Sequence, residues 1–169
     1  MNIMTQLMRI WRPIYISNIV FSARKLSAKG KIREAREELR KVFTITGRKP
    51  PSIEVEPYVN ILFASLSSQL GNDRDAFLAC ELAVNQLSSE MELYGYGAED
   101  VRYLLYCCRA ILARSTNYSD SIAFKLARSI EIRFSDLRID LVDLKFRNTF
   151  HIDSELGHSY DDYISANSI

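Results

Sequence analysis

The residue types best suited to chemistry gather near the end of the chain. His151 and His158 lie seven residues apart. The carboxylates around them are Asp153, Glu155, Asp161 and Asp162. Imidazole and carboxylate groups together can bind a metal ion such as zinc, but such sites use set ligand spacings, for example H-E-x-x-H, and the sequence contains none. The pattern therefore predicts no metal site.

Signatures of catalysis are also missing from the sequence. It has no G-x-S-x-G turn, no glycine-rich phosphate loop and no cysteine close to a histidine. Asp136, Asp140 and Asp143 would share one face if their segment were helical, and we interpret that face as solvated. We predict a protein that is not an enzyme, with no catalytic residue and no cofactor.

The three cysteines, Cys80, Cys107 and Cys108, do not form a disulfide framework or a zinc motif, because their number is odd and no CxxC spacing occurs. All three fall in apolar helical patterns, where a free cysteine behaves as a small hydrophobic residue. Free thiols are typical of a reducing compartment, so we expect a cytoplasmic protein.

The net charge of +1 hides an asymmetry along the chain. Residues 1–49 carry twelve Lys and Arg and three Glu, a net charge of +9, whereas residues 50–169 carry a net charge of −8. This polarity suggests an acidic partner, a membrane surface or a nucleic acid at the N-terminal end, or two halves of the chain that pack on each other.

A candidate basic face takes its residues from the first 41 positions. Its predicted partner-binding residues are Arg24, Lys25, Lys29, Lys31, Arg33 and Arg36, with Arg9, Arg12, Arg40 and Lys41 beside them. Acids within residues 34–38 and the lack of a recognition helix or base-stacking motif weigh against nucleic acid. We expect an acidic protein partner, and peripheral membrane contact through Trp11 and its neighbours is the alternative.

The N-terminal segment has two interpretations. Arg9 and Arg12 precede residues 14–23, which resemble a signal-peptide core, and the acid-free first 33 residues resemble an organelle presequence. Ser17 and Asn18 interrupt the apolar run, and the helical pattern continues to Leu26. We favour a folded basic amphipathic helix, with a targeting segment as the alternative.

Residues 57–72 form the centre of the predicted fold. This stretch has no charged side chain in a protein that is 25% charged, and its apolar residues fall on nearly every face of a helix. Such a helix is either buried or spans a membrane. The polar residues Asn60, Ser65 and Gln69 and the short length argue against a span. Pro57 suits the first helical position.

Hydrophobic periodicity predicts an all-α protein. The expected helices cover residues 2–11, 14–28, 31–46, 57–72, 73–91, 98–114 and 120–132, with breaks at Pro13, Gly30 and Gly47. Residues 134–150 match helical spacing but also alternate like a β-hairpin, and we favour a C-terminal capping helix. Residues 1–150 would form one domain, and residues 151–169 an acidic, loose tail.

Helices two to seven form three hairpins of similar plan. Aligned on their turns, the first repeat has Ala23, Gly30, Ala35, Leu39 and Val42, and the second has Ala64, Gly71, Ala76, Cys80 and Ala83. The third has Ala123, Ala127 and Ile130, with Tyr118 in place of the turn glycine. This pattern of small residues about a turn glycine resembles the tetratricopeptide repeat (TPR) family over residues 14–132. The turns lie 41 and then about 46–47 residues apart instead of 34, because extra residues occupy 48–56 and 90–97.

The resemblance implies a concave groove lined by the first helix of each hairpin. The residues that the repeat register places near it are Ser17, Val20, Arg24, Tyr58, Ser65, Gln69, Leu105 and Cys108. Some TPR proteins bind a terminal carboxylate through Asn, Lys and Arg, but here those positions read Phe21, Leu62 and Cys108, or Arg109 one position later. We expect an apolar groove that holds an amphipathic helix or extended apolar segment, or that residues 134–150 cover.

These observations predict a non-enzymatic protein–protein interaction module, either an adaptor or a chaperone-like holder of an apolar peptide segment. The alternative is a small inhibitor of the immunity or antitoxin kind that blocks one partner enzyme through a charged face. A homodimer is compatible with either function. Tyr94 and Tyr96, which lie beside glycines, predict an aromatic loop that could touch a partner.

Overall fold

The computed structural model describes residues 3–89, 95–114 and 122–137, with residues 3–11 as backbone alone. Within these ranges every regular element is a helix, which confirms the predicted all-α class. The helices are α1 (Ile3–Ala28), α2 (Ile32–Ile45), α3 (Pro57–Gln69), α4 (Asp73–Ser89), α5 (Ala98–Ala113) and α6 (Ile122–Arg133), followed by the 3-10 helix η3 (Ser135–Leu137). None of the described helices combines the length and apolar character needed to cross a membrane.

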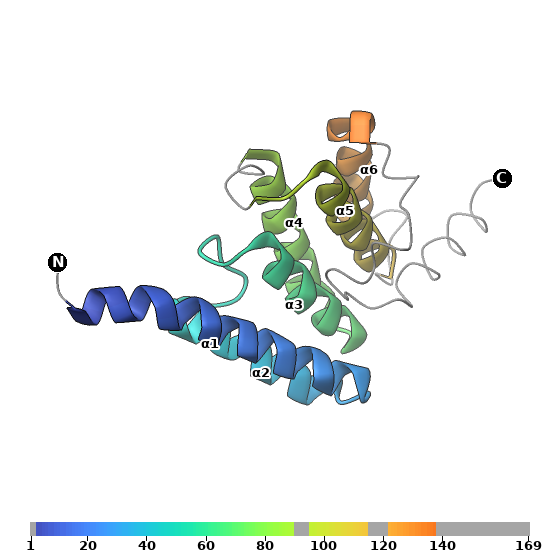
Figure 1. Ribbon diagram of the computed structural model, residues 1–169. Helices are drawn as coiled ribbons and strands as arrows, with labels where there is room; N and C mark the ends of the chain where they lie inside the picture. The colour runs from blue at the N-terminus through green and yellow to red at the C-terminus, as the bar shows by residue number, and fades with distance from the viewer. Residues whose placement is uncertain (1–2, 90–94, 115–121, 138–169) are drawn as a thin grey trace.

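The helices pack as successive hairpins (Figure 1). α1 pairs with α2, α3 with α4, and α5 with α6, and α3 also contacts both α2 and α5. The first hairpin forms one layer of the molecule, and α3 to α6 lie above it in the view of Figure 1. The stack of helical hairpins expected from the sequence is therefore present, with α3 in its middle.

The N-terminal helix differs from the expectation. α1 is continuous from Ile3 to Ala28 with Pro13 inside it, so the prediction that one helix ends at Pro13 and another begins there was wrong. A proline in a helix removes one backbone hydrogen bond and crowds the preceding turn, which bends many helices without ending them.

The burial of α3 explains its lack of charge. Pro57 takes the first helical position, as predicted, and ten of the helix's thirteen residues are buried. Helices α2, α4 and α5 contact α3, so a charged side chain on most of its faces would lose its hydration. The uncharged stretch found in the sequence is thus a helix with other helices on three sides.

The small residues of the repeat pattern lie where helices touch. Ala23 and Ala35 are fully buried where α1 meets α2, and Ala64 and Ala83 are fully buried where α3 meets α4. A methyl side chain lets two helix backbones approach closely, so these positions set the spacing within each hairpin. In the third repeat Ala123, Ala127 and Ile130 are also buried.

Glycines close the turns of the first two hairpins in the same way. Gly30 and Gly71 have φ values of +73° and +72°. After α3, the Asn72 N–H donates to the carbonyl of Ser67 at 2.9 Å and the Gly71 N–H to that of Ser68 at 3.0 Å. This is a Schellman motif, in which a left-handed residue closes the end of a helix.

Replacing Gly71 by alanine should lower the free energy of unfolding by about 1 kcal/mol, because an L-residue is strained at this φ. Nothing lies within 4 Å of the added Cβ, so the cost is conformational and not steric. Chemical denaturation would measure it. Gly71→Asn is the matched control, since asparagine tolerates left-handed φ, and an equal loss in both variants would contradict this explanation.

The C-terminal predictions fall mostly outside the described residues. Phe134 and Leu137 pack against the core, and Ser135–Leu137 forms one 3-10 turn. The remainder of the capping segment predicted at 134–150, and the whole of the 151–169 tail, lie outside the described residues.

Candidate functional site, a cavity beside the first hairpin

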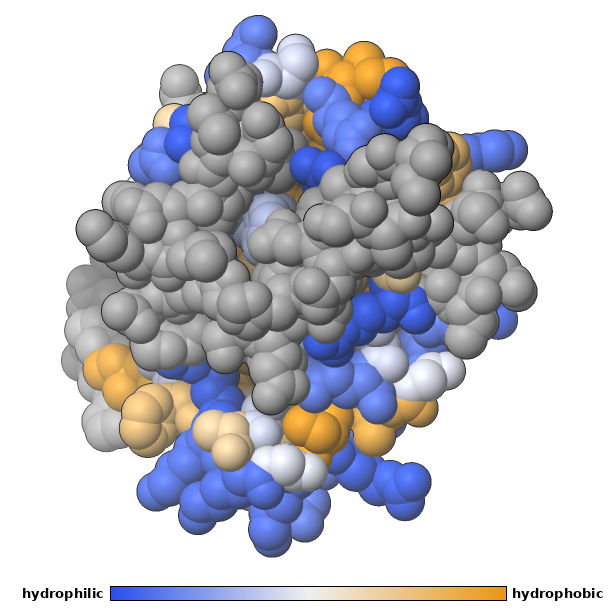
Figure 2. Space-filling model, turned by 90° about the vertical axis from the view of Figure 1, so that its right-hand side faces the viewer, coloured by the Kyte–Doolittle hydropathy of each residue, from blue (hydrophilic) through white to orange (hydrophobic). Residues whose placement is uncertain are grey.

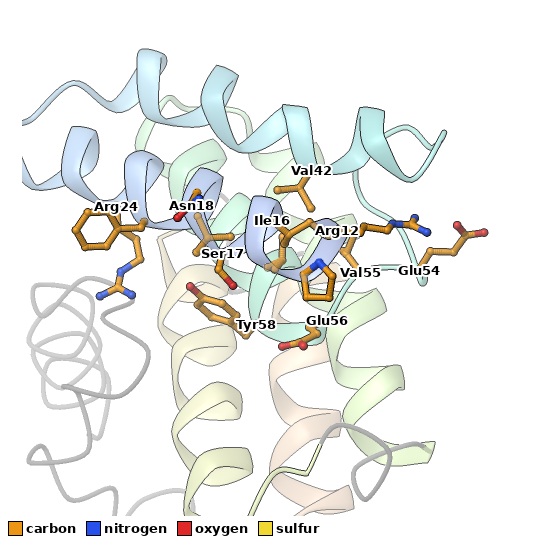
Figure 3. A pocket seen from close by; sticks show the side chains of 14 residues that line it. Arg12, Ile16, Ser17, Asn18, Arg24, Val42, Glu54, Val55, Glu56 and Tyr58 are labelled. Atoms are coloured by element: carbon orange, nitrogen blue, oxygen red, sulfur yellow. The ribbon is translucent and has the colours of Figure 1, made fainter. Parts of the chain in front are cut away.

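A cavity of about 670 Å³ lies between α1, the end of α2, the segment before α3 and the first turn of α3 (Figure 3). Most of the side chains around it are apolar or aromatic, and the charged ones include both arginines and glutamates. Its lining residues are Arg12, Pro13, Ile16, Ser17, Asn18, Val20, Phe21, Arg24, Val42, Glu54, Val55, Glu56, Tyr58 and Val59. The cavity thus joins residues from the first two hairpins and from the connection between them.

One wall is a single face of α1. Pro13, Ser17, Val20 and Arg24 recur at helical spacing, so their side chains project on the same side. Val20 is buried against the core, while Ser17 is exposed at the cavity's edge. The wall is therefore apolar at its base and open to solvent at Ser17.

The opposite wall comes from the inserted residues between the hairpins, and buried amides hold it in place. The Asn60 side chain donates from Nδ2 to the Ser52 carbonyl at 2.9 Å and accepts from the Ser52 N–H at 3.2 Å. Gln86 Nε2 donates to the carbonyls of Ile53 and Val55 at 3.2 and 2.9 Å. Asn60 Nδ2 also donates to Gln86 Oε1 at 2.9 Å, which links the two amides. The inserted segment is thus anchored to α3 and α4, and it carries Glu54, Val55 and Glu56 into the cavity wall.

The acidic groups of the cavity already have partners. Arg48 Nε donates to Glu54 at 2.8 Å, and this bond lowers the pKa of the Glu54 carboxyl. The Tyr96 hydroxyl donates to Glu56 at 3.2 Å. Burial, together with the Glu56 charge, raises the pKa of Tyr96, which therefore stays protonated as a donor.

Arg24, a basic residue of the cavity lining, has a hydrogen-bond donor that lacks an acceptor within the described structure. Arg24 lies beside Tyr58, as Figure 3 shows, and its charge partly offsets the rise that burial causes in the pKa of Tyr58. Arg24 Nε is buried, and no acceptor in the described structure takes its hydrogen. A buried donor without an acceptor is uncommon, and a ligand's oxygen would complete it.

The residues predicted to line a groove separate into two sets. Ser17, Val20, Arg24 and Tyr58 line the cavity together. Ser65, Leu105 and Cys108 are buried in the core, and Gln69 is half-buried with its Nε2 donating to Ser65 Oγ at 3.3 Å. Because α3 packs directly against α5, Ser65, Leu105 and Cys108 offer no surface to a ligand. That half of the groove prediction is corrected.

The predicted basic face is smaller in the structure. Arg36 forms an ion pair with Asp75, donates from Nε to Ser67 Oγ at 3.0 Å and covers the Phe63 ring at 5.0 Å from its centre. It joins α2 to α3 and α4, and is not a partner-binding residue here. Further along α2, pairs join Lys31 to Glu34, Arg40 to Glu37 and Lys41 to Glu38. Lys25, Lys29 and Arg33 are exposed, and no described residue forms an ion pair with any of them.

Candidate chemistry elsewhere is limited. His151, His158, Asp140 and Asp143 lie outside the described residues, and within those residues no His, Cys, Asp or Glu cluster could hold a metal ion. The three cysteines are free and buried, as the sequence suggested. The neighbouring Cys80 and burial raise the pKa of the Cys108 thiol well above its usual range, which disfavours the reactive thiolate.

Two features escaped the sequence analysis. The anchoring role of Asn60 and Gln86 is one, although an amide inside an otherwise apolar helix is a signal that could have marked Asn60. The other is Tyr96, which was predicted in an aromatic loop and is half-buried there, with its hydroxyl bonded to Glu56. Its companion Tyr94 lies outside the described residues. Comparisons with protein-family models, with curated proteins and with solved structures find no match.

Proposed function

We propose that this chain is a non-enzymatic protein-binding module of TPR-like plan, which holds an apolar peptide segment of another protein in the cavity beside α1. The observation that carries the proposal is the cavity itself, of about 670 Å³, between helices fixed by hairpin packing. Its size lies within the range of ordinary ligand sites. Buried free thiols are in keeping with a cytoplasmic setting, which is part of the proposal.

The lining suggests how a peptide would bind. Val20, Val42, Val55 and Val59 are buried at the base of the cavity, so apolar side chains of the peptide would lose contact with water there. Polar groups at the edge would orient the peptide backbone. Arg24 Nε has a hydrogen to donate, and a peptide carbonyl or carboxylate would accept it.

Ser17→Trp should prevent this binding without disturbing the core. Ser17 is exposed and lines the cavity, so an indole at this position would occupy the peptide's place. The matched control is Ala28→Trp, an exposed position on the same helix that does not line the cavity. Immobilised wild type and both variants would be compared for proteins captured from the source cell, measured by quantitative mass spectrometry. We expect the cavity ligand to be depleted about tenfold or more with Ser17→Trp and retained with Ala28→Trp.

If Ser17→Trp captures the same proteins as the wild type in the same amounts, the cavity is not the binding site. The second candidate function, an inhibitor of one enzyme, rests on Lys25, Lys29 and Arg33, which are exposed and form no ion pair with a described residue. Such an inhibitor would capture a single enzyme and reduce its activity, and the capture would survive Ser17→Trp and weaken with added salt.

A further inference from the structure

The side of α1 that faces away from the core has an unusual composition. Ile14, Asn18, Phe21, Lys25 and Lys29 follow one another at intervals of three or four residues, so they form one stripe along the helix or its end, called here the outer stripe. All five are exposed, and Phe21 and Ile14 expose 66% and 52% of their surface. The outer stripe therefore combines large apolar side chains with lysines.

The charge around the outer stripe is positive, and no described acid forms an ion pair with its lysines. No acid occurs before Glu34. The three glutamates of α2, Glu34, Glu37 and Glu38, each pair with a basic residue of the same hairpin. Lys25, Lys29 and the nearby Arg33 pair with no described residue. Their positive charge is consequently available to an anionic surface.

α1 lies at a place in the molecule where a flat partner surface can reach the outer stripe. In Figure 1 α1 runs along the edge of the molecule in front of α2, and α3 to α6 lie on its other side. Figure 2 looks onto the end where α1 meets α2, and hydrophilic side chains with a few hydrophobic ones between them cover its lower part. An extended partner could contact several turns of α1 at once.

We propose that the outer stripe docks this protein on an anionic membrane surface. Asn18 and Phe21 also line the cavity, so the stripe borders the proposed peptide site, while Ile14, Lys25 and Lys29 lie outside it. Phe21 and Ile14 would enter the headgroup region, and Lys25 and Lys29 would contact lipid phosphates. A lipid surface fits the outer stripe better than an acidic protein does. The stripe has exposed apolar groups along one helix, and none of its residues is acidic. Each lysine near an anionic bilayer strengthens the attraction, and the apolar side chains add to it. Neither contribution suffices alone, so binding requires both.

The test is co-sedimentation of the full chain with vesicles of phosphatidylcholine, with and without phosphatidylserine. We expect sedimentation only with phosphatidylserine, and less of it as salt rises. Two variants separate the contributions: Phe21→Ser removes the largest apolar group, and the double variant Lys25→Glu, Lys29→Glu reverses the charge. Each should weaken binding about tenfold or more.

Matched controls lie on other helices. Ile132→Ser removes a side chain of α6 that is 69% exposed, and the double variant Arg74→Glu, Lys125→Glu reverses two exposed charges of α4 and α6. These should bind vesicles as the wild type does, and thermal melting would show that all variants fold. The proposal is overturned if the wild type does not sediment with phosphatidylserine vesicles, or if the control variants lose as much binding as the stripe variants. Because the cavity variant Ser17→Trp leaves the stripe intact, it should still sediment.

Discussion

Phe63→Ala is expected to lower the free energy of unfolding by about 3–5 kcal/mol, the range for a fully buried phenylalanine. Phe63 is completely buried in α3. Its ring meets that of Phe43 edge-on, with 5.4 Å between centres and 67° between planes, and the Arg36 guanidinium covers it. Alanine would leave a cavity between the first and second hairpins and remove the aromatic and cation contacts together.

Urea denaturation followed by far-ultraviolet circular dichroism would measure the loss. Phe21→Ala is the control, since that ring is mostly exposed and its removal should change stability by no more than about 0.5 kcal/mol. Equal effects in the two variants would show that Phe63 is not packed as described. Because α3 contacts both neighbouring hairpins, we also expect the whole helical signal to decrease in one transition.

Asn60→Leu should cost about 2–4 kcal/mol and release the inserted segment before α3. Leucine has the branching and the number of heavy atoms of asparagine but no hydrogen-bonding group. The Ser52 N–H, the Ser52 carbonyl and Gln86 Oε1 would each lose the partner that Asn60 provides. Unsatisfied polar groups at buried positions are costly, so the segment would open to water.

Hydrogen–deuterium exchange tests this directly, because the amides of residues 52–55 should exchange faster while those of α5 change little. Asn18→Leu is the control for hydrogen exchange alone, since Asn18 is exposed on α1 but also lines the cavity. Gln86→Leu should have a similar effect, and the double variant should lose less than the sum, because the two amides share a hydrogen bond. Additive losses and unchanged exchange at residues 52–55 would contradict the anchoring role. Since this segment carries Glu54, Val55 and Glu56 into the cavity wall, Asn60→Leu should also weaken peptide binding.

The helices and their turns could be predicted because their causes are local. Periodic apolar residues specify which face of each helix is buried, and Gly30 and Gly71 permit the left-handed turn that ends α1 and α3. The uncharged stretch in residues 57–72 also marked the most buried helix correctly. Pro13 was misread because a proline lowers the probability of a helix without forbidding it, and α1 continues through this position.

The candidate site could be predicted only in part. Helical register placed Ser17, Val20 and Arg24 on one face of α1, and that face does line the cavity. The same register put Leu105 and Cys108 beside a groove, but α5 packs on α3 and both are in the core. Arg36 shows the same limit, since a residue's charge does not reveal whether its partner is another molecule or Asp75 of the same chain.

The sequence by itself therefore determined the class of fold, the order of the hairpins and the acid-free N-terminal helix, since each depends on neighbouring residues and short-range periodicity. Only the tertiary structure decided where the cavity lies, which basic residues pair with described acids and how Asn60 and Gln86 anchor the inserted segment. These features depend largely on contacts between residues far apart in the sequence, such as Asn60 with Gln86 and Arg36 with Asp75. The balance of packing, desolvation and hydrogen bonding that selects such contacts is settled only when the helices come together.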